Sequence, residues 1–361
     1  MQTRRPKAIA VLVALGATAA GTQAATAAPI KAAWIYVGPH NDGGWSQAHD
    51  NGRKAVQAAL GKDVVTTYKE IVPEGPKASQ VIDSLVRDGN KIIFATSFGY
   101  QDQMLAAAKK YPNVYFEHAT GYKTAKNMAQ YFGAGEDAIY LSGIAAGAAS
   151  KTGKIGMVLP FGIPEVVRHA NAFTLGAQSV NPKATVRVVF TLSWFDKVKE
   201  TKAAQSLVAA GVDVLGQNVD SPATGVVAES KGIPWIGYDD NAQSFAPKSW
   251  QTAAVYNWGP YYTSRVKAAQ AGTWKTGSYY GNLKDKFVGL APFGASVSAA
   301  TKAKIAAAQA KIAAKPYSSF TGPVTDQSGK VQIPAGRIAK LPELLTMNYL
   351  VKGVIGSIPK A

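Results

Sequence analysis

The chain has 361 residues, of which 47% are hydrophobic and 10% aromatic, so it is long enough to form two domains with substantial cores. It contains no cysteine, which excludes disulfides, thiolate metal sites and the lipid-modified cysteine that anchors many exported bacterial proteins. The net charge of +17 could suit a nucleic acid, but the lysine-rich stretches 197–202 and 302–315 mix lysine with alanine at helical spacing, as solvated helix faces do. We therefore expect no nucleic-acid partner.

The first 28 residues have the three parts of a cleaved secretory signal. Basic residues (Arg4, Arg5 and Lys7) precede an apolar run at 8–20 and a small-residue stretch at 24–28. The apolar run is shorter than the roughly 20 residues that span a bilayer. We expect a signal peptide at 1–28, export by the general secretory route in preference to the twin-arginine route, and a periplasmic protein without a lipid anchor.

From residue 32 the sequence alternates β-branched or aromatic runs with segments that carry apolar residues every three or four positions. This alternation is typical of βαβ units and of a parallel sheet. The first helix begins at Ser46, and the predicted strands lie at 32–37, 64–68, 91–95, 114–116 and 128–132.

A second series of the same kind follows Gly153. Its predicted strands lie at 154–159, 185–190, 212–215 and 235–237, and its predicted helices at 164–180, 196–210 and 224–230. A further strand at 252–256 and a helix at 261–271 fit either half, and an Ala/Lys helix at 299–314 precedes a tail rich in Pro, Gly and Ser. Since no low-complexity linker separates the halves, we expect two lobes joined by short crossings.

The loops that follow the predicted strands are where a ligand of a parallel α/β sheet binds. These loops combine aromatic residues with Gly, Asn, Asp or Glu, at 38–45, 96–100, 117–118, 160–162, 193–196, 218–221 and 238–241. Aromatic faces can stack on a flat heteroaromatic ring while amides and carboxylates bind its edge. Trp45 and Trp194, which polar residues and glycine border, favour a ligand-facing role, whereas Phe98, Phe161 and Phe195 are equally suited to capping the lobe cores.

Catalytic motifs are missing from the sequence. It has no serine-hydrolase elbow, phosphate-binding lysine loop, paired-histidine zinc motif or dinucleotide glycine fingerprint, and its four histidines are dispersed. We therefore expect no metal, no cofactor and no enzymatic activity, although paired carboxylates such as Asp239 and Asp240 leave acid–base chemistry open.

Several segments in order resemble the basic membrane protein family of ABC-transporter substrate-binding proteins, whose known members include purine-nucleoside receptors. The segments that carry the resemblance are 41–47 (NDGGWSQ), 94–102, 236–239 (IGYD) and 320–331. The resemblance covers essentially the whole mature chain. It implies a type I periplasmic-binding-protein fold, with residues 29–150 and 251–286 in the N-terminal lobe and residues 152–250 and 287–361 in the C-terminal lobe.

The resemblance also implies roles for individual residues. Trp45 replaces a stacking phenylalanine, Ser46 an asparagine that binds the base edge, and Glu117 lies where an acidic residue contacts the base. Asp239 matches an aspartate that holds ribose hydroxyls, whereas Tyr36 and Tyr256 stand where the nucleoside receptors have an aspartate and a ribose-binding lysine. The full expected ligand set is Tyr36, Asn41, Asp42, Trp45, Ser46, Phe98, Glu117, Phe161, Trp194, Asp239 and Tyr256.

Because Tyr36 and Tyr256 stand where the nucleoside receptors have two polar sugar contacts, the hydroxyls of a ribose would lack partners in this protein. We therefore expect a monomeric periplasmic receptor that binds a purine, as a free nucleobase such as adenine in preference to a nucleoside, and delivers it to an ABC permease in the inner membrane. The alternatives are a sugar or other small-solute receptor on the same fold, a periplasmic nucleoside-processing enzyme, and a ligand-sensing partner of a membrane receptor.

Overall fold

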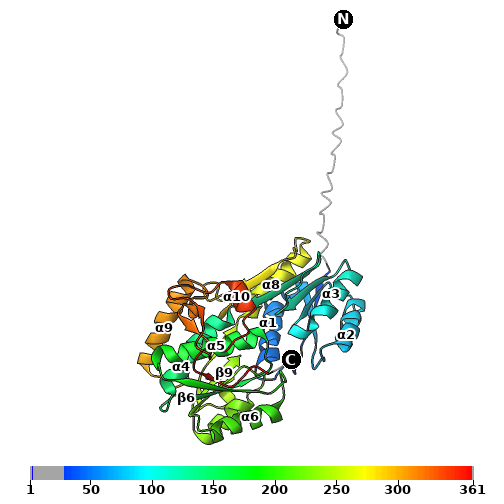
Figure 1. Cartoon of the computed structure of the whole chain (residues 1–361). Helices are drawn as coiled ribbons and strands as arrows, with labels where there is room; N and C mark the ends of the chain where they lie inside the picture. Colours follow the sequence, from blue (N-terminus) through cyan, green and yellow to red (C-terminus); the bar gives the residue numbers. More distant parts are fainter. Residues whose placement is uncertain (1, 3–27, 360–361) are drawn as a thin grey trace.

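The computed structural model describes residue 2 and residues 28–359, so the predicted signal at 1–28 lies almost wholly outside the described residues. The described chain forms two α/β lobes, each built on one large sheet (Figure 1). Blue and cyan segments make up most of the first lobe, and green segments most of the second. The prediction of two parallel-sheet lobes flanked by helices is confirmed.

The first lobe contains a six-stranded parallel sheet in the order β11-β5-β4-β3-β1-β2. Helices α1 and α8 pack against each other beside this sheet, and α2 packs against α3. The strands are β1 (Ile30–Ile35), β2 (Val64–Lys69), β3 (Ile92–Ala95), β4 (Tyr115–Ala119), β5 (Met128–Gly133) and β11 (Ser278–Gly281), and the helices are α1 (Trp45–Leu60), α2 (Pro76–Arg87), α3 (Gln101–Lys110) and α8 (Trp258–Gln270).

The second lobe contains a seven-stranded sheet in the order β12-β10-β9-β8-β6-β7-β15, in which only the β10–β12 pair is antiparallel. Its strands are β6 (Lys154–Leu159), β7 (Thr185–Phe190), β8 (Val214–Gln217), β9 (Trp235–Asp239), β10 (Trp250–Tyr256), β12 (Val288–Leu290) and β15 (Val354–Ile355). Its helices are α4 (Gly135–Ala149), α5 (Pro164–Val180), α6 (Lys197–Ala209) and α7 (Ala223–Lys231).

Helix α4 is buried on nearly all sides between α5 and the second sheet. A helix that is apolar all round has no amphipathic stripe, and the three-to-four-residue pattern therefore did not reveal it in the sequence. Its close packing on α5 depends on Gly176, where a Cβ would overlap the carbonyl oxygen of Tyr140. This tight helix pair is the centre of the second lobe.

The strand pairing corrects the expected lobe boundaries at two segments. Strand β10 pairs with β9 and β12 and so belongs to the second sheet, although residues 251–286 were assigned to the first lobe. Helix α4, assigned to the first lobe within 29–150, packs on α5 and β10. The chain therefore crosses between the lobes after β5, after β10 and between β11 and β12.

The C-terminal segment packs along the second lobe (Figure 1). The predicted helix at 299–314 is α9 (Ala299–Ala314), which Ser298 caps by accepting a hydrogen bond from Thr301 N, and its Ile305 and Ile312 are buried. The remaining elements are β13 (Val324–Thr325), β14 (Val331–Ile333), α10 (Leu341–Leu345) and the short 3₁₀ turns η1 (Gly61–Asp63), η2 (Phe98–Tyr100), η3 (Gln243–Phe245) and η4 (Ser318–Phe320). Within residues 28–359, no helix combines the length and the apolar composition that a membrane span requires.

Candidate ligand-binding site

The strand order places one topological switch point in each lobe. In the first sheet β1 lies between β2 and β3, and in the second sheet β6 lies between β7 and β8. At such a point the connections that follow two adjacent strands run in opposite directions and leave a crevice beyond the carboxyl ends of these strands. Ligands of open α/β sheets bind in this crevice. The loops after β1, β3, β6 and β8 therefore form the expected site in both lobes.

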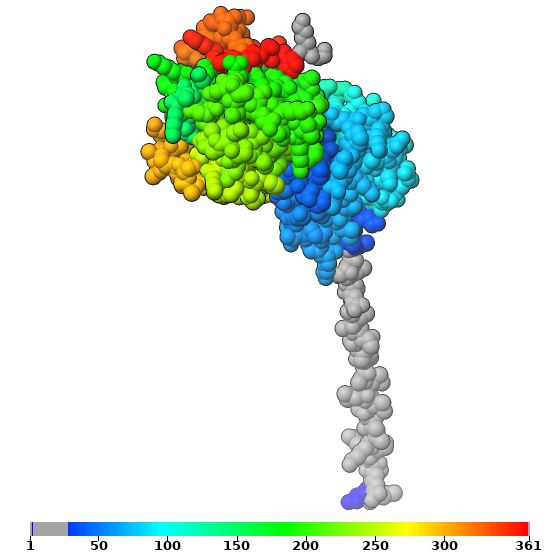
Figure 2. Space-filling view, turned by 90° about the horizontal axis from the view of Figure 1, so that it is seen from below, coloured from blue at the N-terminus to red at the C-terminus, as the bar shows by residue number. Residues whose placement is uncertain are grey.

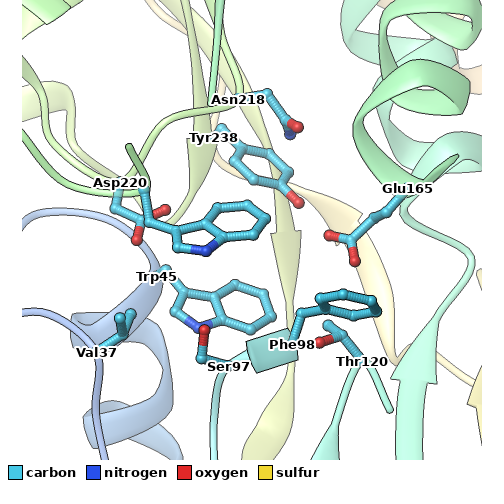
Figure 3. Close-up of a pocket in the computed structure, with 10 residues that line it drawn as sticks. Val37, Trp45, Ser97, Phe98, Thr120, Glu165, Asn218, Asp220 and Tyr238 are labelled. Carbon is cyan, nitrogen blue, oxygen red and sulfur yellow. The ribbon is translucent and has the colours of Figure 1, made fainter. Parts of the chain in front are cut away.

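A cavity of about 340 Å³, including space open to solvent, lies where these loops meet (Figure 3). Both lobes contribute to its wall, with Val37, Trp45, Ser97, Phe98 and Thr120 from the first and Glu165, Trp194, Asn218, Asp220 and Tyr238 from the second. In Figure 3 the Tyr238 hydroxyl and the Glu165 carboxylate extend toward each other across the space above Phe98. The cavity thus combines several aromatic rings with a few oriented polar groups, as small-molecule sites do.

Trp45 is held rigidly at the start of α1. Its indole Nε1 donates a hydrogen bond to the carbonyl oxygen of Thr96 at 2.6 Å, and the rings of His49 and Trp258 pack edge-on against it at centroid distances of 4.3 and 5.6 Å. Only 7% of the residue is exposed. A fixed ring at the cavity wall gives a flat ligand a stacking surface that costs little conformational entropy.

Two carboxyl groups of the second lobe give the cavity its acceptor character. Asp220 is 3% exposed, and its Oδ2 has no hydrogen-bond partner among the described residues. Burial, with the negative charges of Asp42 and Asp239 nearby, raises the pKa of Asp220 well above its usual range. Glu165 lies in the first turn of α5, where burial raises its pKa to about 7. An unpartnered buried carboxyl is costly, so a ligand with N–H or O–H donors would stabilise this arrangement.

The two lobes are closed on each other around the cavity. From helix α1 of the first lobe, Gln47 Nε2 and Asn51 Nδ2 donate hydrogen bonds of 2.8 and 3.0 Å to Oδ2 of Asp240 in the second lobe. The backbone at Gly44 approaches Asp220 so closely that a Cβ on Gly44 would overlap the Asp220 carbonyl oxygen. On the face shown in Figure 2, the blue and cyan surface of the first lobe directly adjoins the green surface of the second.

Five of the expected ligand residues lie in or beside the cavity. Trp45, Phe98 and Trp194 form part of its wall. Phe161 packs edge-on against Trp194 at a centroid distance of 5.1 Å and lines the adjacent groove. Tyr256 lies one layer behind the wall, where it stacks on Trp258 at 4.9 Å and its hydroxyl is 3.3 Å from that of Tyr238.

The expected polar residues of the 41–46 segment organise helix α1 instead of lining the cavity. Asp42 is buried and accepts hydrogen bonds from the backbone N–H groups of Gly44, Ser46 and Gln47, the donors that a helix start leaves free. Burial raises the pKa of Asp42 to about 6. The Ser46 hydroxyl accepts from Gly38 N at 3.1 Å, and Asn41 is exposed to solvent. None of the three lines the cavity, and their contact with a ligand stays a prediction.

Three further expected residues also lie outside the cavity wall. Tyr36 is fully buried in the first lobe and donates to Asp50 at 3.1 Å. Glu117 is fully buried and accepts hydrogen bonds from Tyr261, Arg265 and Trp274, so its charge is already neutralised away from the cavity wall. Asp239 is buried at the end of β9 with a left-handed φ of 70°. The preceding residue, Tyr238, takes the place in the wall that was expected for Asp239.

Sequence reasoning did not select Val37, Ser97, Thr120, Glu165, Asn218, Asp220 and Tyr238. Ser97, Asn218, Asp220 and Tyr238 stand in loops that the sequence had indicated, so the missing information was which side chain of each loop points inward. Glu165 follows Pro164 at a predicted helix start, and its local sequence gave no signal for a ligand contact.

The two lobes with a cavity between them have the type I periplasmic-binding-protein fold. A solved structure that shares this fold is an ABC-transporter solute-binding protein from Conexibacter woesei DSM 14684, with a TM-score of 0.65 and 22% sequence identity over 79% of this chain and 96% of that chain. Proteins of this class bind a small molecule and present it to a membrane permease.

The chain belongs to the Bmp family, described as ABC transporter substrate-binding protein PnrA-like, whose model matches residues 30–317. A purine-binding protein of Brucella abortus (strain 2308) is 42% identical over 337 residues, which cover 92% of this chain and 94% of the relative. A relative from Haloferax volcanii with the name "Putative ABC transporter glucose-binding protein TsgA13" is 37% identical over 77% of this chain and 71% of its own length. The predicted family is confirmed.

Proposed function

We propose that this protein binds a purine in the cavity between its lobes, as a free nucleobase such as adenine in preference to a nucleoside, and delivers it to the permease of an ABC importer. The observation that carries the proposal is the pairing of aromatic walls with the unpartnered carboxyl of Asp220. A purine ring can stack on the indoles, and its exocyclic amine or ring N–H can donate to Asp220. The 42% identity to a purine-binding protein supports the same ligand class.

The preference for a free base rests on the positions that resemblance to nucleoside receptors assigns to the ribose. None of these three residues, Tyr36, Asp239 and Tyr256, lines the cavity. The hydroxyl of Tyr36 donates to Asp50, and that of Tyr256 lies beside Tyr238. The hydroxyls of a ribose would therefore enter the site without the partners that a nucleoside receptor provides. Because unpaired hydroxyls at a buried site lower affinity, a nucleoside should bind more weakly than its free base.

A sugar receptor is the second candidate, because a relative of 37% identity is named as glucose-binding and because tryptophan faces with carboxylates also suit sugars. The two candidates differ in where the polar groups must lie. A sugar presents hydroxyls around its whole ring, whereas both carboxyl groups of this wall, Glu165 and Asp220, come from the second lobe. The first lobe contributes three apolar side chains and only the hydroxyls of Ser97 and Thr120. This one-sided placement of the carboxyl groups favours a flat base.

The test is isothermal titration of the mature protein with adenine, guanine, hypoxanthine, adenosine, inosine, ribose and glucose. We expect tight binding of a base and weaker binding of its nucleoside. Asp220→Asn and Trp194→Ala should each weaken base binding about tenfold or more. Asp102→Asn, at an exposed carboxylate on the first-lobe surface, is the matched control. Tighter binding of nucleosides would overturn the free-base preference, and binding of glucose alone would overturn the ligand class.

We also propose that the protein is a periplasmic monomer that returns its ligand unchanged. Recovery of intact ligand after prolonged incubation with the protein, together with the mass of a single chain in solution, would support both parts. Conversion of adenosine or inosine to a base would instead indicate a nucleoside-processing enzyme.

A further inference from the structure

A second cavity adjoins the proposed base site. It encloses about 1120 Å³, including space open to solvent. Its wall comes from both lobes and from the C-terminal segment. The first lobe contributes the β4–β5 connection with Tyr122 and strand β11 with Tyr279, the second lobe contributes the start of α5 with Glu165 and Arg168, and the C-terminal segment contributes α10 with Leu345. The function proposed above does not use this cavity.

The two cavities share three wall residues, which are Phe98, Thr120 and Glu165. Figure 3 shows these three grouped on one side of the base site, with the Glu165 carboxylate above the Phe98 ring. Among the described residues, Glu165 forms no ion pair, so its carboxyl is free to accept a hydrogen bond where the cavities meet. A ligand bound in the first cavity can therefore extend past Phe98 and Glu165 into the second.

Large apolar side chains with substantial solvent exposure gather around the second cavity. Tyr122 is 63%, Leu345 44% and Tyr279 36% exposed, although each has a side chain that would gain from burial. Tyr122 belongs to the first lobe and Leu345 to the C-terminal segment that packs on the second lobe. A group placed between them would bury apolar surface of both lobes at once and so stabilise their closed arrangement.

The basic group of this cavity is already neutralised. The Arg168 guanidinium is buried and pairs with Glu136 at 3.2 Å, and the Tyr280 hydroxyl donates to the same carboxylate at about 3.0 Å. A phosphate or carboxylate entering the cavity would therefore compete with Glu136 for Arg168. The chemistry of the wall fits an apolar group and disfavours an anionic one.

We propose that the two cavities form one elongated site, whose ligands are aminopurines that carry an apolar substituent on the exocyclic amine. The base occupies the first cavity, the substituted amine donates its N–H to Glu165, and the apolar substituent lies between Tyr122 and Leu345. This inference rests on the proposed purine-binding function and deepens it by naming the class of purine.

The experiment compares the affinities of adenine, N6-benzyladenine and N6-(carboxymethyl)adenine by isothermal titration. We expect N6-benzyladenine to bind about tenfold or more tighter than adenine, and the carboxymethyl compound to bind no tighter than adenine. In Tyr122→Ala and in Leu345→Ala, the ratio of benzyladenine to adenine affinity should fall toward one. Val331→Ala, which truncates an exposed apolar residue outside both cavities, should keep the wild-type ratio.

The outcomes separate the two proposals. If adenine binds but N6-benzyladenine binds equally or less tightly, the elongated site is refuted and the purine-binding function stands. A tighter benzyladenine complex with an unchanged ratio in both alanine variants would place the substituent elsewhere and would also refute it. If neither compound binds, the purine-binding function itself fails and the inference fails with it. Thermal melting of each variant verifies that it is folded.

Discussion

Closure of the two lobes depends on the absence of a side chain at Gly44. In the closed arrangement, a Cβ at this position would overlap the Asp220 carbonyl oxygen and lie 2.9 Å from its carbonyl carbon. Because backbone atoms of a packed lobe cannot yield as a flexible side chain can, Gly44→Ala should hold the lobes apart by roughly 1 Å. An open arrangement that separates Gly44 from Asp220 should tolerate the methyl group.

The expected loss follows from the contacts that the displacement would break. The hydrogen bonds from Gln47 and Asn51 to Asp240, at 2.8 and 3.0 Å, would lengthen beyond hydrogen-bonding range. At about 1 kcal/mol for each partly exposed bond, the closed complex would lose about 2 kcal/mol, which corresponds to a roughly 30-fold weaker affinity for adenine.

Titration calorimetry with adenine measures this loss, and small-angle X-ray scattering shows whether the liganded variant remains more open than the wild type. Gly277→Ala is the matched control, because Gly277 is exposed and an added Cβ there would meet no atom within 4 Å. Wild-type affinity in Gly44→Ala would refute the closure argument. A lower melting temperature of the ligand-free variant would indicate a folding defect in place of a closure defect.

Three further predictions concern other parts of the molecule. Asp240→Ala removes the acceptor of both lobe-crossing amides, so it should weaken adenine binding about 30-fold, as the loss of two bonds of about 1 kcal/mol requires, without changing the melting temperature of the free protein. An unchanged affinity would contradict the role of this contact. Burial raises the pKa of Glu200 from 4.5 to about 7, so between these pH values the folded protein keeps a proton on Glu200 that the unfolded chain has released. The contribution of protonated Glu200 to the stability of the fold should therefore decline as the pH rises from about 4.5 to about 7. Glu200→Gln should flatten the melting-temperature profile over this range, whereas an unaltered profile would show that other groups govern it. Gly176→Ala should lower the free energy of unfolding by about 1–3 kcal/mol through overlap with the Tyr140 carbonyl, as chemical denaturation can measure, while Gly289→Ala, with no atom nearby, should not.

The sequence by itself determined the class of fold and the approximate place of the site. Apolar periodicity predicted most strands and helices of both lobes to within a few residues, since spacing along the chain is a local property of each element. It missed helix α4 and the short strands β11, β12 and β15. The prediction of a helix at 299–314 matches α9 at both ends. The aromatic and polar loops after the strands were also visible, because parallel strands bring their carboxyl ends to one edge of the sheet.

Only the tertiary structure decided which residues of those loops line the cavity. Asp42 and Asp220 are both acidic residues in loops near the carboxyl ends of strands, yet Asp42 satisfies the backbone of α1 while Asp220 remains unpartnered in the cavity wall. Glu117 likewise depends on Arg265, which is 148 residues away in the sequence. Whether a buried carboxylate is neutralised or left free for a ligand depends on partners from distant segments, and local sequence patterns contain no information about them.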